Sequence, residues 1–186
     1  KKDKEKEEAD ILLGFIGKRI VDSLSKLRKI KWRIERIELQ PVSLGRIVKG
    51  NAIVIDFGHR TTKVYAYNEG SLFSVIDIPI AGERLNETIK SLYPSLDLEG
   101  IYEKKHNSFV WNEYLDLEGK SPEEISISKR LTEDIMSLSS EIKVNIRSLE
   151  LQHNIYFDNI YYLGGTANLL YLIETVSRDL DFNIKH

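Results

Sequence analysis

The chain has no cysteine, and its only methionine is Met136. Without cysteine it can form neither disulfide bonds nor thiolate metal sites, and we expect a cytoplasmic protein. No apolar run approaches the roughly 20 residues of a membrane-spanning helix, and no secretory signal pattern is present. Because the chain starts at Lys1 rather than at a methionine, we expect it to be a piece of a longer protein.

The chain also has no large excess of positive or of negative charge. The 27 lysine and arginine residues nearly balance the 29 aspartate and glutamate residues, which leaves a net charge of -2. Such a chain has no overall basic field for binding nucleic acid. Its 186 residues, of which 41% are hydrophobic and 30% charged, are typical of one globular domain, or of one domain with a small appendage.

Residues 51–67 carry the most informative pattern. Ala52 to Phe57 form an apolar, β-branched run, which is typical of a buried strand. Gly58 ends this run, and alternation resumes from Thr61 to Tyr67. The pattern therefore predicts two strands that meet at a tight turn.

One acid, Asp56, lies near the end of the first of these strands. A buried carboxylate without a partner is costly, so we expect Asp56 to face a cleft, a cation or a hydrogen-bond donor. Backbone amides of the turn and the hydroxyls of Thr61 and Thr62 can hold phosphate oxygens, while the aspartate can hold a hydrated metal ion. The alternative is an ordinary hairpin whose turn satisfies the aspartate.

Hydrophobic periodicity and turn residues predict the elements that follow. We expect a strand at 71–80, helices at 83–93, 98–105 and 121–151, a strand at 158–163, a helix directly after 167, and a last strand at 182–184. Ser121 and Glu124 form the pattern of a capping box at the start of the long helix. Residues 107–119 have no stable period, and we predict a loop or a local strand pair with surface aromatics.

The first part of the chain is predicted to be a strand–helix–strand piece. We expect residues 1–9, most of which are charged, to be solvated or disordered. A strand at 10–16, a helix from 17 to about 29 and a strand at 30–39 follow. Residues 41–48 are predicted to form a short connecting helix.

Gly164 and Gly165, followed by Thr166, stand between a predicted strand and a predicted helix. Glycines at such a junction let a ligand approach the backbone and place it at a helix N-terminus, where free amides favour anions or polar rings. A tight turn that needs glycine for a positive φ explains the pair equally well.

Taken together and in order, these segments resemble the actin-like ATPase superfamily. Residues 54–62 resemble its second phosphate motif, and 162–169 look like its adenosine motif. Residues 78–89 are similar to the Ile-Pro-Val-Gly-Gly segment of the FtsA and PilM proteins. Residues 39–44 look like the segment that connects the two halves of these proteins, and 11–39 resemble the end of the small FtsA-type subdomain.

The resemblance implies an α/β fold with two parts. Residues 40–186 would form a ribonuclease H-like, actin-type half with a mixed five-stranded sheet and flanking helices, preceded by the end of a small subdomain at 1–39. ATP and magnesium would lie in a cleft between two such halves. Asp56 would hold magnesium through water, Gly58, Thr61 and Thr62 the phosphates, and Gly164, Gly165 and Thr166 the adenosine, with Lys105 near the family's nucleotide lysine.

Several positions depart from the family pattern. His59 replaces a common glycine, Gln40 stands where an acid is frequent, and Tyr102 stands where relatives often have glutamate. The first phosphate motif and the first half are absent from the chain. We therefore expect the piece alone to bind ATP weakly or not at all and to show no turnover, and the complete protein to be at most a weak ATPase. His59 is interpreted as a turn residue, and no catalytic residue is assigned.

Two functions follow from the resemblance. The first is an ATP-binding assembly or adaptor protein of bacterial cell division or of type IV pilus or secretion machinery. Such a protein would self-associate or form filaments and bind membrane-bound partners at the inner face of the membrane, without a membrane span of its own. The second is a nucleotide-silent scaffold or interaction module of the same fold, which His59 and Tyr102 favour. A sugar kinase or chaperone ATPase fits the segment at 78–89 less well.

Overall fold

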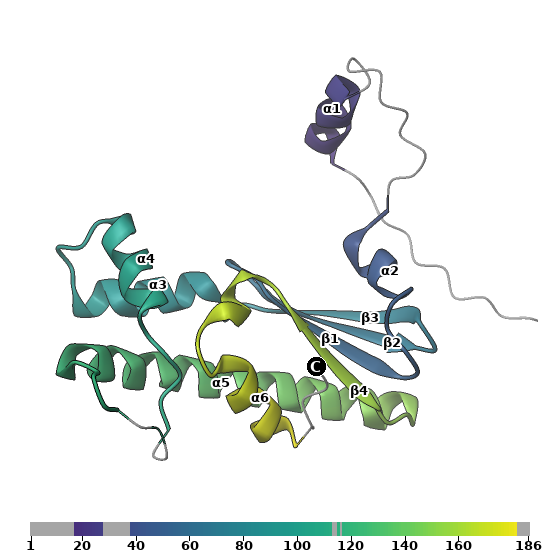
Figure 1. The fold of residues 1–186 in the computed structure, drawn as a ribbon. Helices are drawn as coiled ribbons and strands as arrows, with labels where there is room; N and C mark the ends of the chain where they lie inside the picture. The colour runs from purple at the N-terminus through teal and green to yellow at the C-terminus, as the bar shows by residue number, and fades with distance from the viewer. Residues whose placement is uncertain (1–16, 28–37, 113–114, 116, 182–186) are drawn as a thin grey trace, which may run out of the picture.

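The computed structural model describes residues 17–27, 38–112, 115 and 117–181. These residues form a mixed sheet with helices around it (Figure 1). The elements in chain order are α1 (Lys18–Leu27), α2 (Gln40–Leu44), β1 (Ala52–Phe57), β2 (Thr62–Asn68), β3 (Ser71–Ile78), α3 (Gly82–Leu92), α4 (Leu98–His106), α5 (Pro122–His153), β4 (Asn159–Leu163), the 3-10 helix η2 (Gly165–Asn168) and α6 (Leu172–Leu180).

The sheet has the strand order β3-β2-β1-β4 in the described part of the chain. β1 pairs with β2 antiparallel, through the turn predicted after Gly58, and with β4 in parallel. In this register Asp56 lies opposite Leu163, so β1 and β4 end at the same edge of the sheet. A parallel pair needs a long crossover connection, and here α3, α4 and α5 lie within it.

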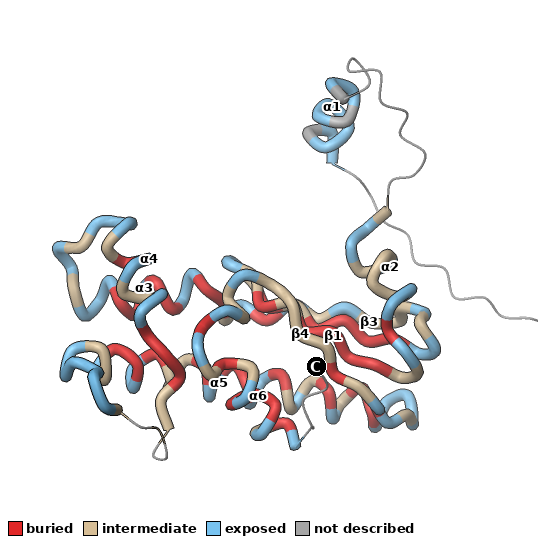
Figure 2. The backbone as a smooth tube through the Cα atoms, viewed as in Figure 1, coloured by how far each residue is buried: buried red, intermediate tan, exposed pale blue. Residues whose placement is uncertain are grey.

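The main core lies between one face of the sheet and α5 with α6. Figure 2 shows buried residues along the strands and along one side of α5. The apolar stripe predicted for the long helix is confirmed, because Ile127, Leu131, Ile135, Leu138, Ile142, Ile146 and Leu149 are all buried. Ile53, Ile55 and Phe57 of β1 belong to the same core. The opposite face of the sheet carries a smaller cluster around Val54 and Tyr65.

The helix starts and ends agree with the sequence in most places. The capping box of Ser121 and Glu124 is present at the start of α5. α3 and α4 lie where they were predicted, and α1 lies within the helix expected at 17–29. The connecting helix is shorter than predicted: α2 ends at Leu44, and a turn follows it.

Two predictions were wrong. The helix expected directly after residue 167 begins only at Leu172, because η2 and a left-handed Tyr171 with φ of 65° come first. The segment 107–119 does not present all its aromatics at the surface. Phe109 is 2% exposed, and a parallel bridge joins it to Leu170.

Other predicted elements lie outside the described residues: the strand at 10–16, the strand at 30–39 except for residues 38 and 39, the fifth strand of the sheet at 182–184, and the solvated run at 1–9. Residues 38 and 39 are not in a strand. The division of the chain at residue 39 therefore stays a prediction. No helix in the described ranges is long and apolar enough to cross a bilayer.

Candidate functional site

Two loops that are about a hundred residues apart in the sequence meet at one edge of the sheet. One follows β1 and the other follows β4, and these two strands run parallel to each other. The hydroxyl of Thr166 donates a hydrogen bond of 2.9 Å to the carbonyl of Gly58. The loops predicted to hold phosphates and adenosine are therefore joined directly.

Gly164 brings the backbone of the second loop against Asp56. Its φ of 99° and ψ of 156° are accessible almost only to glycine. A Cβ atom at this position would lie 2.6 Å from Oδ1 of Asp56 and 2.5 Å from the carbonyl oxygen of Phe57. The glycine is thus needed both for its backbone conformation and for the space beside the carboxylate. At Gly165 a Cβ atom would meet nothing within 4 Å.

Burial raises the pKa of Asp56 above its ordinary value, and the nearby Lys63 opposes that shift. Lys63 is also the residue opposite Asp56 across the antiparallel pair, but its amine donates to Asp77. The carboxylate is half-buried and directed at the loop edge, where a cation would favour its charged form.

The arrangement fits a hydrated magnesium ion. Magnesium keeps several of its waters and takes only one or two carboxylates. Among the residues that the structure describes, no group of three or more histidine, aspartate and glutamate side chains could hold a metal ion directly. If the ion binds here, Asp56 would hold it through water, and the ion would supply positive charge for phosphate oxygens. This assignment stays a prediction.

The other residues predicted to bind phosphate differ in their surroundings. Thr62 is fully buried, and its hydroxyl donates a 2.7 Å hydrogen bond to the carbonyl of Ile80. This hydroxyl is engaged inside the protein, whereas Thr61 is half-exposed in the turn. Gly58 is needed for the shape of the turn, because a Cβ atom there would lie 2.5 Å from the carbonyl oxygen of Thr61.

The start of α3 contacts both loops. The amide of Gly82 donates to the carbonyl of Gly58 at 3.1 Å, and the amide of Glu83 donates to the carbonyl of His59 at 2.6 Å. A Cβ atom at Gly82 would lie 2.5 Å from the hydroxyl oxygen of Thr166. The glycine of the Ile-Pro-Ile-Ala-Gly segment is thus a packing requirement of this junction.

A cavity of about 690 Å³ opens beside this junction, between α3 and α4. Its lining residues are His59, Glu83, Asn86, Glu87, Lys90, Ser91, Leu96, Asp97, Leu98, Ile101 and Tyr102. The sequence had singled out only His59 and Tyr102 among them. The polar residues at 83, 86, 87 and 90 recur at helical spacing and therefore lie on one face of α3. This spacing could have indicated from the sequence that they share one surface.

Lys105 contacts two residues of α3 and α4 that line this cavity. Its amine donates to Oδ1 of Asn86 at 2.7 Å and lies 5.1 Å from the ring centroid of Tyr102. Burial lowers the pKa of Lys105. The structure therefore brings Lys105 next to the cavity through its contacts with Asn86 and Tyr102. His59 lines the cavity and also belongs to the turn after β1, so the cavity adjoins the edge of the sheet where the two loops meet.

No family description and no curated protein matches the chain. Solved structures do match it. The PilM-PilN type IV pilus biogenesis complex matches with a TM-score of 0.64 and 18% identity, over 88% of this chain and 46% of the other. MreB5 of Spiroplasma citri bound to AMPPNP matches with a TM-score of 0.61 and 15% identity, over 91% of this chain and 60% of the other. The ethanolamine utilization protein EutJ from Carboxydothermus hydrogenoformans matches with a TM-score of 0.55 and 20% identity, over 78% of this chain and 46% of the other.

These matches define the class of fold. The chain has the actin-like fold, as the sequence predicted, with a mixed sheet and flanking helices. The MamK double helical filament is a further neighbour, with a TM-score of 0.55 and 20% identity. The chain spans roughly half the length of the solved proteins that it matches.

Proposed function

We propose that this chain belongs to an actin-like, ATP-binding assembly or adaptor protein of bacterial cell division or of type IV pilus or secretion machinery. The observation that carries the proposal is the contact between the two loops, with Thr166 bound to Gly58 and Asp56 against Gly164. Together with the cavity at α3 and α4, these loops form one wall of a cleft. In the complete protein the other half would supply the opposite wall.

Each predicted residue has a part in this proposal. Asp56 holds magnesium through water, and Gly58 and Thr61 face the phosphates. Thr62 supports the turn through its bond to Ile80. Gly164, Gly165 and Thr166 contact the adenosine, and Lys105 approaches the nucleotide. No residue is assigned to catalysis, and hydrolysis by the complete protein is expected to be weak.

Nucleotide would act by favouring one assembly state. A ligand shared by two walls of a cleft stabilises the closed arrangement, and it shifts any assembly equilibrium that depends on closure. Structural neighbours include a complex of PilM with PilN and a filament of MamK. Self-association and binding to a membrane-bound partner, at the inner face of the membrane, are the corresponding proposals for this protein.

The test is a thermal-shift measurement on the complete protein with ATP and magnesium. A ligand at 100 times its dissociation constant adds about 2.7 kcal/mol to the free energy of unfolding. We expect Asp56→Ala to abolish the shift. The matched control is Asp158→Ala, which removes an exposed aspartate directly before β4, at the end of the sheet opposite the two loops. An unchanged shift in Asp56→Ala would remove this residue from the site.

A nucleotide-silent scaffold of the same fold is the second candidate. The engagement of the Thr62 hydroxyl with Ile80 and the presence of His59 at the cavity wall favour it. The absence of any shift with ATP and magnesium in the complete natural protein would support this candidate over the first.

A further inference from the structure

α3 carries different contacts on two of its sides. Glu83, Asn86 and Lys90 line the cavity. Arg84 and Thr88 instead reach α5, against which α3 packs. Any force that moves α3 relative to α5 therefore moves a wall of the cavity.

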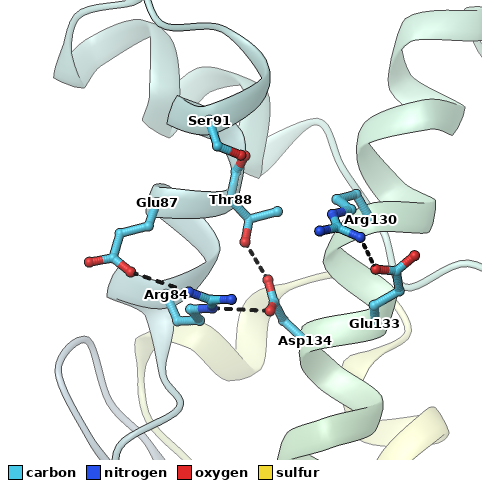
Figure 3. A network of polar contacts seen from close by, with 7 residues as sticks. All are labelled: Arg84, Glu87, Thr88, Ser91, Arg130, Glu133 and Asp134. Atoms are coloured by element: carbon cyan, nitrogen blue, oxygen red, sulfur yellow. Dashed lines mark hydrogen bonds and ion pairs between the residues drawn. The ribbon is translucent and has the colours of Figure 1, made fainter.

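The contact with α5 centres on one carboxylate, Asp134, as Figure 3 shows. The hydroxyl of Thr88 donates to Oδ2 of Asp134, and Nε of Arg84 donates to Oδ1 at 3.2 Å. We refer to Arg84, Thr88 and Asp134 as the α3–α5 latch. The side chain of Asp134 is only 15% exposed, and Thr88 is buried. Hydrogen bonds to a carboxylate that is largely shielded from water are among the stronger ones in proteins.

The first two residues of the same helix contact the loop after β1. The amides of Gly82 and Glu83 donate to the carbonyls of Gly58 and His59. Thr88 lies only six positions after Gly82, which is fewer than two turns of helix. A helix of this length moves as a rigid element, so the latch and the loop contacts depend on the same placement of α3.

We infer that Asp134 is a positioning residue for the candidate site. By holding Thr88 and Arg84, it keeps the start of α3 bonded to the loop after β1 and keeps the other side of α3 in place as the cavity wall. This role concerns the arrangement of α3 and is independent of which ligand enters the cavity. Only the nucleotide measurement described below rests on the proposed function.

An ion pair links the latch to a residue that lines the cavity. Nη1 of Arg84 lies 3.8 Å from a carboxylate oxygen of Glu87, and Glu87 also lines the cavity. The neighbouring pair Arg130 and Glu133 lies on α5 itself and is exposed on both sides. This pair bonds within α5, next in sequence to Asp134, and it therefore offers a matched control.

The direct test is site-resolved amide hydrogen exchange by NMR without nucleotide. In Asp134→Ala we expect the amides of Gly82 and Glu83 to exchange about tenfold faster or more, as the loss of hydrogen bonds to a charged group implies. Asp134→Asn keeps one acceptor oxygen and should restore part of the protection. Glu133→Ala, which breaks only the pair within α5, should leave both amides at the natural rate.

A second variant guards against a general loss of stability. Thr88→Val keeps the volume of the side chain on α3 and removes only the hydroxyl, and it should accelerate the same two amides. The inference is overturned if both amides keep their natural rates in Asp134→Ala and Thr88→Val. It is also overturned if exchange rises equally across β1, β4 and α6, because the effect is then global unfolding.

A nucleotide titration separates this inference from the proposed function. If the natural protein binds ATP, Asp134→Ala should weaken the affinity for ATP about tenfold. Asp134→Asn should recover part of this affinity, and Glu133→Ala should bind ATP as the natural protein does. Equal affinity in Asp134→Ala and the natural protein would count against the positioning role. If the natural protein binds no ATP, the proposed function fails, and the exchange measurement alone decides on Asp134.

Discussion

At the scale of single residues, the junction of the two loops depends on positions where no side chain fits. Gly164 lies against the carboxylate of Asp56 and the backbone of Phe57, and Gly82 lies against Thr166. Each glycine lets two segments of backbone approach more closely than a Cβ atom would permit. The candidate site thus depends on glycines that have no side chain as much as on its polar groups.

Gly164→Ala should lower the free energy of unfolding by about 3 kcal/mol, because alanine cannot adopt this backbone conformation without strain and its Cβ would meet the carbonyl of Phe57. Urea denaturation measures the loss. The control is Gly165→Ala, next in the chain, where a Cβ has open space and the effect should stay within about 0.5 kcal/mol. Equal losses in the two variants would contradict the explanation.

The pKa of Asp56 makes a second prediction at this scale. Burial raises it above 3.8, so the folded state holds this proton more tightly than the unfolded state. The resulting contribution to stability is fully present below pH 3.8 and is lost as the pH rises through the folded pKa. Asp56→Asn, which stays neutral, should therefore gain stability relative to the natural protein as the pH rises through this window.

Urea denaturation of both proteins across a pH series measures that difference. Titrations of other groups largely cancel in the comparison, because the two proteins differ only at position 56. A constant difference between pH 3 and pH 7 would show that the pKa of Asp56 is the same in the folded and unfolded states.

At the scale of elements, α5 is the framework of the main core, and its first turn is capped by its own sequence. The Ser121 hydroxyl accepts from the amide of Glu124, and the Glu124 carboxylate accepts from the amide of Ser121. Ser121→Ala should cost about 1 kcal/mol of stability, measured by urea denaturation. Ser126→Ala, at an exposed position inside the helix, should be neutral or slightly stabilising. A cost at Ser126 equal to that at Ser121 would argue against the capping box.

Elements that carry their own signals were predicted correctly. The capping residues and apolar stripe of α5, and the glycine turn between β1 and β2, depend on nearest neighbours and on a regular period. The errors fall where distant contacts decide the backbone. Leu170 leaves the expected helix because it bridges to Phe109, and Tyr171 takes a left-handed conformation that no local pattern favours.

At the scale of the whole molecule, the proposed function makes the described residues one wall of a site that a second half would complete. The loop edge and the cavity at α3 and α4 adjoin through His59, and the fold is that of proteins about twice as long. In the thermal-shift test we accordingly expect the 186-residue chain alone to respond weakly to ATP and magnesium, or not at all. A shift as large in this chain as in the complete protein would show that one wall suffices for binding.

The sequence by itself determined the strands, the long helix and the glycines of both loops, because short-range sterics and hydrophobic period leave few alternatives there. Its resemblance to actin-like proteins also predicted the fold that the structural comparison confirms. Only the tertiary structure decided that the Thr62 hydroxyl donates to Ile80, that Lys105 donates to Asn86, and that Thr88 donates to Asp134. These contacts join residues that are 18 to 46 positions apart, and the energy of each depends on burial and geometry that no local pattern records.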